Sequence, residues 1–126
     1  MNDKKKLINS AKQSMKNAYA PYSKFRVGAA LLTISGKIYT GCNIENASFG
    51  LTLCAERVAL FKAVSGGAKS FKSIAIVATK NPVYPCGACR QALYEFAPGL
   101  KIFVLEKKRI EELALQELLP LGFHFI

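Results

Sequence analysis

The chain has 126 residues, of which 51% are hydrophobic and 21% charged, and its formal net charge is +10 at pH 7. This length suits one folded domain, residues 1–126; the apolar content excludes a disordered chain, and no apolar run reaches the roughly 18 residues of a membrane helix. The lysines are scattered rather than gathered in one run, so we expect neither a nucleic-acid nor a membrane partner.

The first half of the chain predicts one helix and a hairpin. Residues 5–20 repeat apolar side chains at helical spacing and are stopped by Pro21. This segment lacks the continuous apolar core of a secretory signal, so we expect a cytoplasmic protein. The β-rich pieces Phe25–Thr33 and Lys37–Thr40 flank a Ser-Gly pair, which predicts a hairpin. Gly28 and the alanines after it predict a close neighbour on the first strand.

The second half alternates helices with strands. We predict helices over residues 53–65, 86–97 and 110–120, and buried strands over residues 72–79 and 101–106. Two strands joined through a helix should be parallel, whereas the opening hairpin is antiparallel. The order of elements therefore predicts an α/β fold in which helices cover both faces of one mixed sheet.

Three cysteines stand at the starts of two predicted helices. Cys54 begins one helix, and Cys86 and Cys89 share the first turn of the other. A helix start lowers the pKa of a thiol and favours the thiolate that a metal binds. Three protein ligands with an open fourth position are typical of catalytic zinc, so the sequence predicts one Zn²⁺ per chain.

Other interpretations of the cysteines remain open, and one histidine has to be placed. Cys42 as a fourth ligand would make the zinc site structural, although a lone cysteine is often a small buried hydrophobe. The C-x-x-C pair alone would suit a redox site, but that leaves the nearby Cys-x-Glu unexplained. His124, the single histidine, is expected to pack or to face solvent.

Glu56 and Arg57 directly follow the first cysteine helix start. A carboxylate at this position could reach a water in the open zinc position and act as general base and then acid. A solvated first-turn glutamate is the simpler alternative for an isolated residue. Three thiolates around Zn²⁺ leave a net negative charge. Arg57 is the first candidate to offset this charge by hydrogen bonding to sulfur, and Arg90 is the second. A surface salt bridge is the alternative for either arginine.

The motifs together resemble the zinc-dependent cytidine deaminase family. The pattern is Cys54-Ala55-Glu56 followed by Pro85-Cys-Gly-Ala-Cys89. The stretches "YAPYSKFRVGAAL", "GCNIENASFGLTLCAERVAL" and "PCGACRQAL" extend the likeness to the small homotetrameric enzymes that act on free nucleosides. The resemblance implies a single three-layer α-β-α domain with a mixed five-stranded sheet.

The same resemblance implies which residues contact a nucleoside. Phe25 would pack near the pyrimidine, and the backbone at Ala55 would contact the base. Asn43 and Glu45 would hold the 3′-hydroxyl of the ribose, a pairing that rejects analogues lacking this group. Without the resemblance, the last two residues would pass for ordinary turn residues.

The implied reaction is hydrolytic loss of the 4-amino group from cytidine or 2′-deoxycytidine. Zinc would activate the water while Glu56 moves its protons to N3 and to the departing amine. The resemblance also implies a homotetramer whose active sites are shared between subunits. Phe49 and a tail aromatic, Phe123 or Phe125, are then candidates for contacts across subunits.

Some features differ from the family pattern. The loop before Pro85 is shorter than usual, and Tyr84 stands where many relatives have a small residue. The positive charge would suit a deaminase that edits polynucleotides, but such relatives usually have histidine in place of Cys54. An antibiotic-nucleoside deaminase is a further alternative, and it fits the "FRVGAAL" and "CNIENAS" stretches less well.

Overall fold

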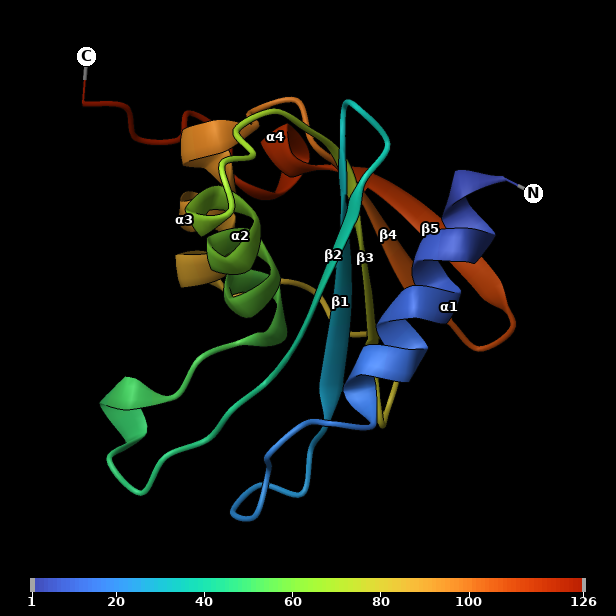
Figure 1. The fold of residues 1–126 in the computed structure, drawn as a ribbon, viewed down its shortest axis with the longest axis vertical. Coiled ribbons are helices and arrows are strands. Elements are labelled where there is room, and N and C mark those ends of the chain that lie inside the picture. Colours follow the sequence, from blue (N-terminus) through green and yellow to red (C-terminus); the bar gives the residue numbers. More distant parts are fainter. Residues whose placement is uncertain (1, 126) are drawn as a thin grey trace.

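The computed structural model describes residues 2–125, which form one five-stranded sheet with helices on both faces (Figure 1). The strands are β1 (Val27–Thr33), β2 (Ile38–Cys42), β3 (Phe71–Ala78), β4 (Lys101–Glu106) and β5 (Arg109–Ala114). Their order in the sheet is β2-β1-β3-β4-β5. Only β3 and β4 pair in parallel, and the other three pairs are antiparallel, so the predicted mixed sheet is confirmed.

The described part of the chain also contains four α-helices and one short 3₁₀ helix. They are α1 (Asp3–Met15), η1 (Phe49–Leu51), α2 (Ala55–Ser65), α3 (Gly87–Phe96) and α4 (Leu115–Leu118). Within residues 2–125, no helix combines the length and apolarity that crossing a bilayer requires.

Two separate apolar clusters show that the predicted three layers are present. On one face, α1 places Leu7, Ile8 and Ala11 against the sheet. On the other face, α2 and α3 contribute side chains such as Leu60 and Leu93 to a larger cluster. Alternate residues of each strand enter opposite clusters, as the period of two in a strand requires. The metal-ligand candidates all lie on the α2–α3 side.

Two glycines set the distance between the helices and the sheet. A Cβ on Gly28 would lie 2.0 Å from the Ala11 carbonyl oxygen of α1, which explains the small residue predicted to have a close neighbour. A Cβ on Gly41 of β2 would lie 2.5 Å from both the Ala55 oxygen and the Ala59 nitrogen. Gly41 therefore lets the start of α2 rest directly on the sheet.

We expect Gly41→Ala to destabilise the protein by about 1–3 kcal/mol, because the added methyl group meets backbone atoms that cannot turn aside. The thermal unfolding midpoint should fall accordingly. Gly99→Ala is the matched control, since nothing lies within 4 Å of its added Cβ. Equal midpoints for the two variants would contradict this account of helix spacing.

The predicted helix over residues 110–120 is wrong in its first half. Residues up to Ala114 form β5, which pairs with β4 from Glu106↔Arg109 to Lys101↔Ala114, and only Leu115–Leu118 is helical. Leucine, alanine and glutamate favour a helix locally, but pairing with an otherwise open sheet edge outweighs that preference. Lys107, at φ 55°, makes the tight turn between the two strands.

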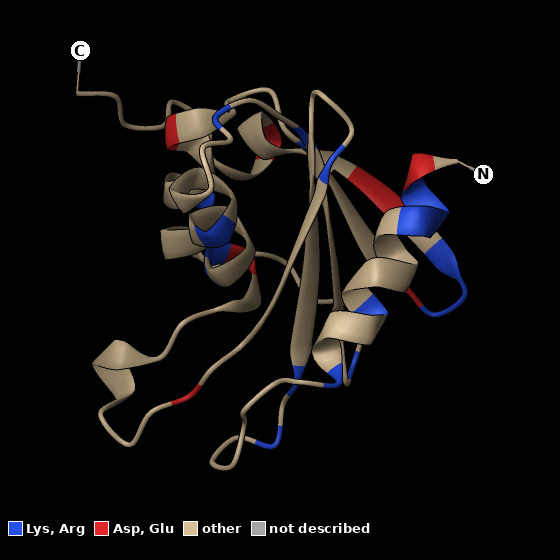
Figure 2. Cartoon of the chain, in the orientation of Figure 1, with Lys and Arg blue, Asp and Glu red and all other residues tan. Residues whose placement is uncertain are grey.

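The basic side chains are spread over several elements (Figure 2). They occur on α1, in the loop after it, on α2 and in the β4–β5 hairpin. This spread agrees with the dispersed lysines of the sequence.

Candidate metal centre and the adjoining cavity

Three cysteine sulfurs meet where α2 and α3 begin. Cys54 is the N-cap of α2, Cys86 is the N-cap of α3, and Cys89 lies in the first turn of α3. Neither N-cap cysteine makes a capping hydrogen bond, so both thiols remain available as ligands. The positive ends of both helix dipoles favour negative charge at this point.

The spacing of these sulfurs fits a zinc ion. The three Sγ atoms lie within 4.8 Å of one another, and those of Cys54 and Cys86 are 3.8 Å apart. Zn–S bonds of about 2.3 Å in a tetrahedral site put two sulfurs about 3.8 Å apart. The thiols also interact with one another. A hydrogen bond between Cys89 and Cys54 lowers the pKa of Cys54 and raises the pKa of Cys89.

In the part of the chain that the structure describes, this group contains three ligands and no fourth. Cys42 lies outside the group, at the end of β2, where burial raises the pKa of its thiol. The structural-zinc alternative that required Cys42 therefore has no support in the geometry. His124 is also absent from the group, and its ring packs 4.7 Å from that of Tyr94.

Glu56 is a buried carboxyl group beside the three sulfurs. It lies in the first turn of α2, is only 4% exposed and lines the same cavity as Cys54 and Cys86. Burial, together with the nearby Cys54 thiolate, raises the pKa of Glu56 to about 7. A carboxyl group with this pKa is suited to accept and donate protons near neutral pH.

The guanidinium of Arg57 lies against the sulfur group. Its Nη2 donates a hydrogen bond to the Cys54 sulfur at 3.6 Å, and this bond raises the pKa of Arg57. Arg90 lies elsewhere, because its Nε donates to the Pro85 carbonyl at 2.7 Å and its Nη1 to the Leu118 carbonyl at 2.8 Å. Of the two arginines considered from the sequence, Arg57 is therefore the one at sulfur.

A cavity of about 280 Å³ opens onto Cys54, Cys86 and Glu56. Its lining includes every residue that the sequence predicted to contact the nucleoside, except the aromatics Phe49 and Phe125. Its lining comprises Ser23, Phe25, Val27, Asn43, Glu45, Thr52, Leu53, Cys54, Ala55, Glu56, Val83, Tyr84 and Cys86. Apolar walls with a few convergent polar groups are typical of a small-molecule site.

Hydrogen bonds to the backbone hold the polar end of this cavity. The Asn43 side chain accepts from the Val27 N–H and donates to the Phe25 carbonyl, both at 2.8 Å. The Glu45 carboxylate accepts from the backbone N–H groups of Tyr22 and Ser23 and from the Ser23 hydroxyl, which lowers the pKa of Glu45. Both side chains are thus fixed while keeping unused hydrogen-bonding capacity.

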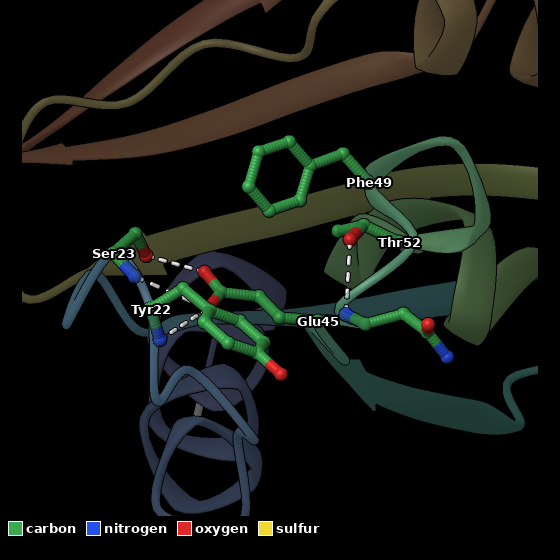
Figure 3. Close-up of a pocket in the computed structure, with 6 residues that line it drawn as sticks. Tyr22, Ser23, Glu45, Phe49 and Thr52 are labelled. Carbon is green, nitrogen blue, oxygen red and sulfur yellow. Dashed lines mark hydrogen bonds between the residues drawn. The ribbon is translucent and has the colours of Figure 1, made fainter.

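A second cavity of about 350 Å³ continues from this polar end (Figure 3). Tyr22 and Phe49 both line it and pack edge to face, with ring centroids 6.3 Å apart, and Glu45 lines both cavities. Phe49 is 76% exposed and Phe125 is 91% exposed. Neither aromatic lines the cavity beside Cys54 and Cys86.

Sequence reasoning missed several residues of the cavity walls. Ser23 and Thr52 join the polar end, and Val83 lines the wall beside Cys86 together with Tyr84, which the sequence indicated only as a departure from the family pattern. The position of Val83 and Tyr84 directly before the Pro-Cys motif was the available signal. Ser23 had no such signal, because its contact with Glu45 joins residues 22 positions apart.

Comparisons with known proteins agree with this geometry. Residues 1–105 match the family model described as the cytidine and deoxycytidylate deaminase zinc-binding region. Over 124 residues the chain is 53% identical to the cytidine deaminase of Sporosarcina psychrophila (96% of this chain, 91% of the relative). It is 52% identical over the same length to that of Halalkalibacterium halodurans (96% and 94%).

A solved structure gives the same result for the fold. The 1.6 Å crystal structure of cytidine deaminase from Burkholderia pseudomallei superposes with a TM-score of 0.91 at 45% identity, covering 98% of this chain and 100% of that one. The likeness thus extends over almost the whole chain, including the sheet and both helix layers. The chain belongs to the cytidine and deoxycytidylate deaminase family.

Proposed function

We propose that this protein deaminates cytidine and 2′-deoxycytidine hydrolytically, giving uridine, 2′-deoxyuridine and ammonia in pyrimidine salvage. The observation that carries this proposal is one cavity whose lining joins Cys54 and Cys86 of the three-sulfur group with buried Glu56 and the polar pair Asn43 and Glu45. Relatives named cytidine deaminase, about half identical over almost the whole chain, support the same reaction.

Cys54, Cys86 and Cys89 would hold one zinc ion per chain. When bound there, zinc supplies a Lewis acid that makes a water molecule more acidic. Glu56 accepts a proton from the attacking water and donates it to N3 of the cytosine. Glu56 then transfers the proton of the new hydroxyl group on C4 to the amino nitrogen, and the C4–N bond breaks. Ammonia leaves, and uridine keeps the carbonyl at C4 and the proton at N3.

The other cavity residues would bind and orient the nucleoside. Phe25 offers an apolar surface for the pyrimidine, and the backbone of Ala55 lies beside Glu56 for contact with the base. Asn43 and Glu45 would bind the 3′-hydroxyl, since each is held rigidly and has a free acceptor. This clamp favours a free nucleoside over a polynucleotide, in which the 3′ oxygen carries a phosphate.

Arg57 would offset the negative charge of three thiolates around zinc. We expect Arg57→Gln to lower zinc affinity or kcat by about 10–100-fold, the usual cost of losing a group that hydrogen-bonds to a ligand. Zinc content after dialysis and kcat measured at saturating zinc would separate the two effects. Arg109→Gln removes an exposed arginine far from the sulfurs and should change neither quantity.

The protein would work in the cytoplasm as a homotetramer with shared active sites. Phe49 and Phe125 are highly exposed, so they have apolar surface available for a neighbouring subunit. Tetramer formation would bury such surface, and Phe49 already borders the second cavity. Light scattering of the purified protein would report the mass.

Zinc analysis combined with ultraviolet monitoring of cytidine tests the proposed reaction. We expect close to one zinc per chain, loss of cytidine absorbance and one ammonia per uridine formed. Single-stranded DNA and RNA serve as comparison substrates and should remain unchanged. A zinc-loaded protein that leaves cytidine intact would refute the proposal, and turnover of polynucleotide alone would favour an editing enzyme.

A further inference from the structure

The cavity wall next to the metal centre contains a tyrosine that is anchored at both ends. Tyr84 lies two residues before Cys86, lines the cavity and is 40% exposed. Pro85 between them is fully buried, and its carbonyl accepts the 2.7 Å hydrogen bond from Arg90. The backbone of this wall is therefore fixed relative to the first turn of α3.

The other end of Tyr84 is tied to the edge strand. Its hydroxyl donates a 2.7 Å hydrogen bond to the Glu111 carboxylate of β5, and this bond raises the pKa of the phenol. Glu111 pairs with Val104, which belongs to the apolar cluster under α2 and α3. Residues paired across two strands share a face, so Glu111 lies on the cavity side of the sheet.

The position of this wall limits the room around the reacting atom. Any atom that reacts at the metal centre must lie near Cys86 and Glu56, and Tyr84 lines the cavity within two residues of Cys86. The cavity of about 280 Å³ is at the lower end of the roughly 300–1,000 Å³ usual for ligand pockets, and the second cavity shares only residues of the polar end with it. A tethered aromatic ring in so small a cavity leaves little space for an additional group on the substrate.

We propose that Tyr84, held by Glu111, is a specificity-determining residue that excludes bases enlarged at or beside the reacting carbon. This inference rests on the proposed deaminase function and adds to it the size limit of the base. Enlarged bases here means a methyl group on C5 or on the exocyclic nitrogen of cytidine. Glu111 is a positioning residue in this scheme, because it acts through the tyrosine.

The test compares kcat/KM for cytidine, 5-methylcytidine and N4-methylcytidine in the zinc-loaded full chain. Tyr84→Ser removes the ring, and Tyr84→Phe removes only its tether to Glu111. We expect the methylated-to-cytidine ratio to rise at least 10-fold in Tyr84→Ser for one or both analogues, with a smaller rise in Tyr84→Phe. One methyl group in a tight pocket commonly changes selectivity by 10–200-fold.

A matched pair of glutamates on β5 controls for general effects on the strand. Glu111→Ala should shift the ratio as Tyr84→Phe does. Glu112→Ala should leave the ratio unchanged, because Glu112 bonds Lys4 at 2.8 Å, on the opposite face. If both glutamate variants lower turnover of all three nucleosides equally, the two residues only stabilise the fold and the inference is wrong.

Binding measured in parallel keeps the two proposals distinguishable. Dissociation constants for the same three nucleosides test the size limit even in a protein that turns none of them over. Cytidine turnover with unchanged ratios in Tyr84→Ser overturns the role of the tyrosine alone. Absence of turnover in the zinc-loaded wild type refutes the deaminase function instead.

Discussion

Glu56→Gln is expected to lower kcat for cytidine by about 10²–10⁴-fold, the range that a positioned general acid–base contributes. Glutamine keeps the size of the side chain but cannot exchange protons with water, N3 or the leaving amine. The fold should survive, since a buried neutral amide costs less than a buried carboxylate, and Glu56 is only 4% exposed. Turnover, zinc content and the thermal midpoint should be measured on the same preparation.

Glu95→Gln provides the matched control for this loss. Glu95 lies on the exposed side of α3, so the same chemical change occurs on a helix of the site but away from the cavity. We expect wild-type kcat from this control. A Glu56→Gln protein that keeps its zinc and also keeps kcat would contradict the proton-transfer role.

Replacing Cys86 or Cys89 with alanine is expected to remove zinc and, with it, turnover. Loss of a partner that only supports a ligand costs about 10–100-fold in metal affinity, so loss of a direct ligand should cost more. Zinc content after dialysis should fall from one per chain to near zero. Cytidine turnover should fall to background in the same samples.

Cys42→Ala is the control that separates a three-ligand site from a four-ligand site. Its thiol lies outside the sulfur group, so this variant should retain both zinc and activity. Loss of zinc from Cys42→Ala would restore the structural-zinc interpretation. Retention of zinc after alanine replacement of Cys86 would show that the sulfur group does not hold the metal.

The metal centre could be predicted from sequence because its ligands follow local rules. Cys86 and Cys89 are three residues apart at a helix start, and Cys54 and Glu56 mark the start of another helix. The strand over residues 101–106 was predicted with its observed bounds, since it is a continuous apolar run between turn signals. Signals confined to one turn or one strand are readable without tertiary structure.

The remaining features depend on contacts between distant segments. Residues 110–114 have the composition of a helix, and only the free edge of β4 makes them a strand. This misassigned strand supplies Glu111, so the tether of Tyr84 was also invisible in the sequence. The clamp of Glu45 by Ser23 likewise joins two loops that have no shared pattern.

The two helix starts that meet at the cysteine sulfurs have a consequence for folding as well as for chemistry. Cys54 and Cys86 are 32 positions apart, so an ion between them closes a loop that contains α2 and β3. A metal ion held by the native chain and not by the unfolded chain adds its binding free energy to the stability of the fold. Because β3 is the middle strand of the sheet, metal loading should slow amide hydrogen exchange at the centre of the sheet.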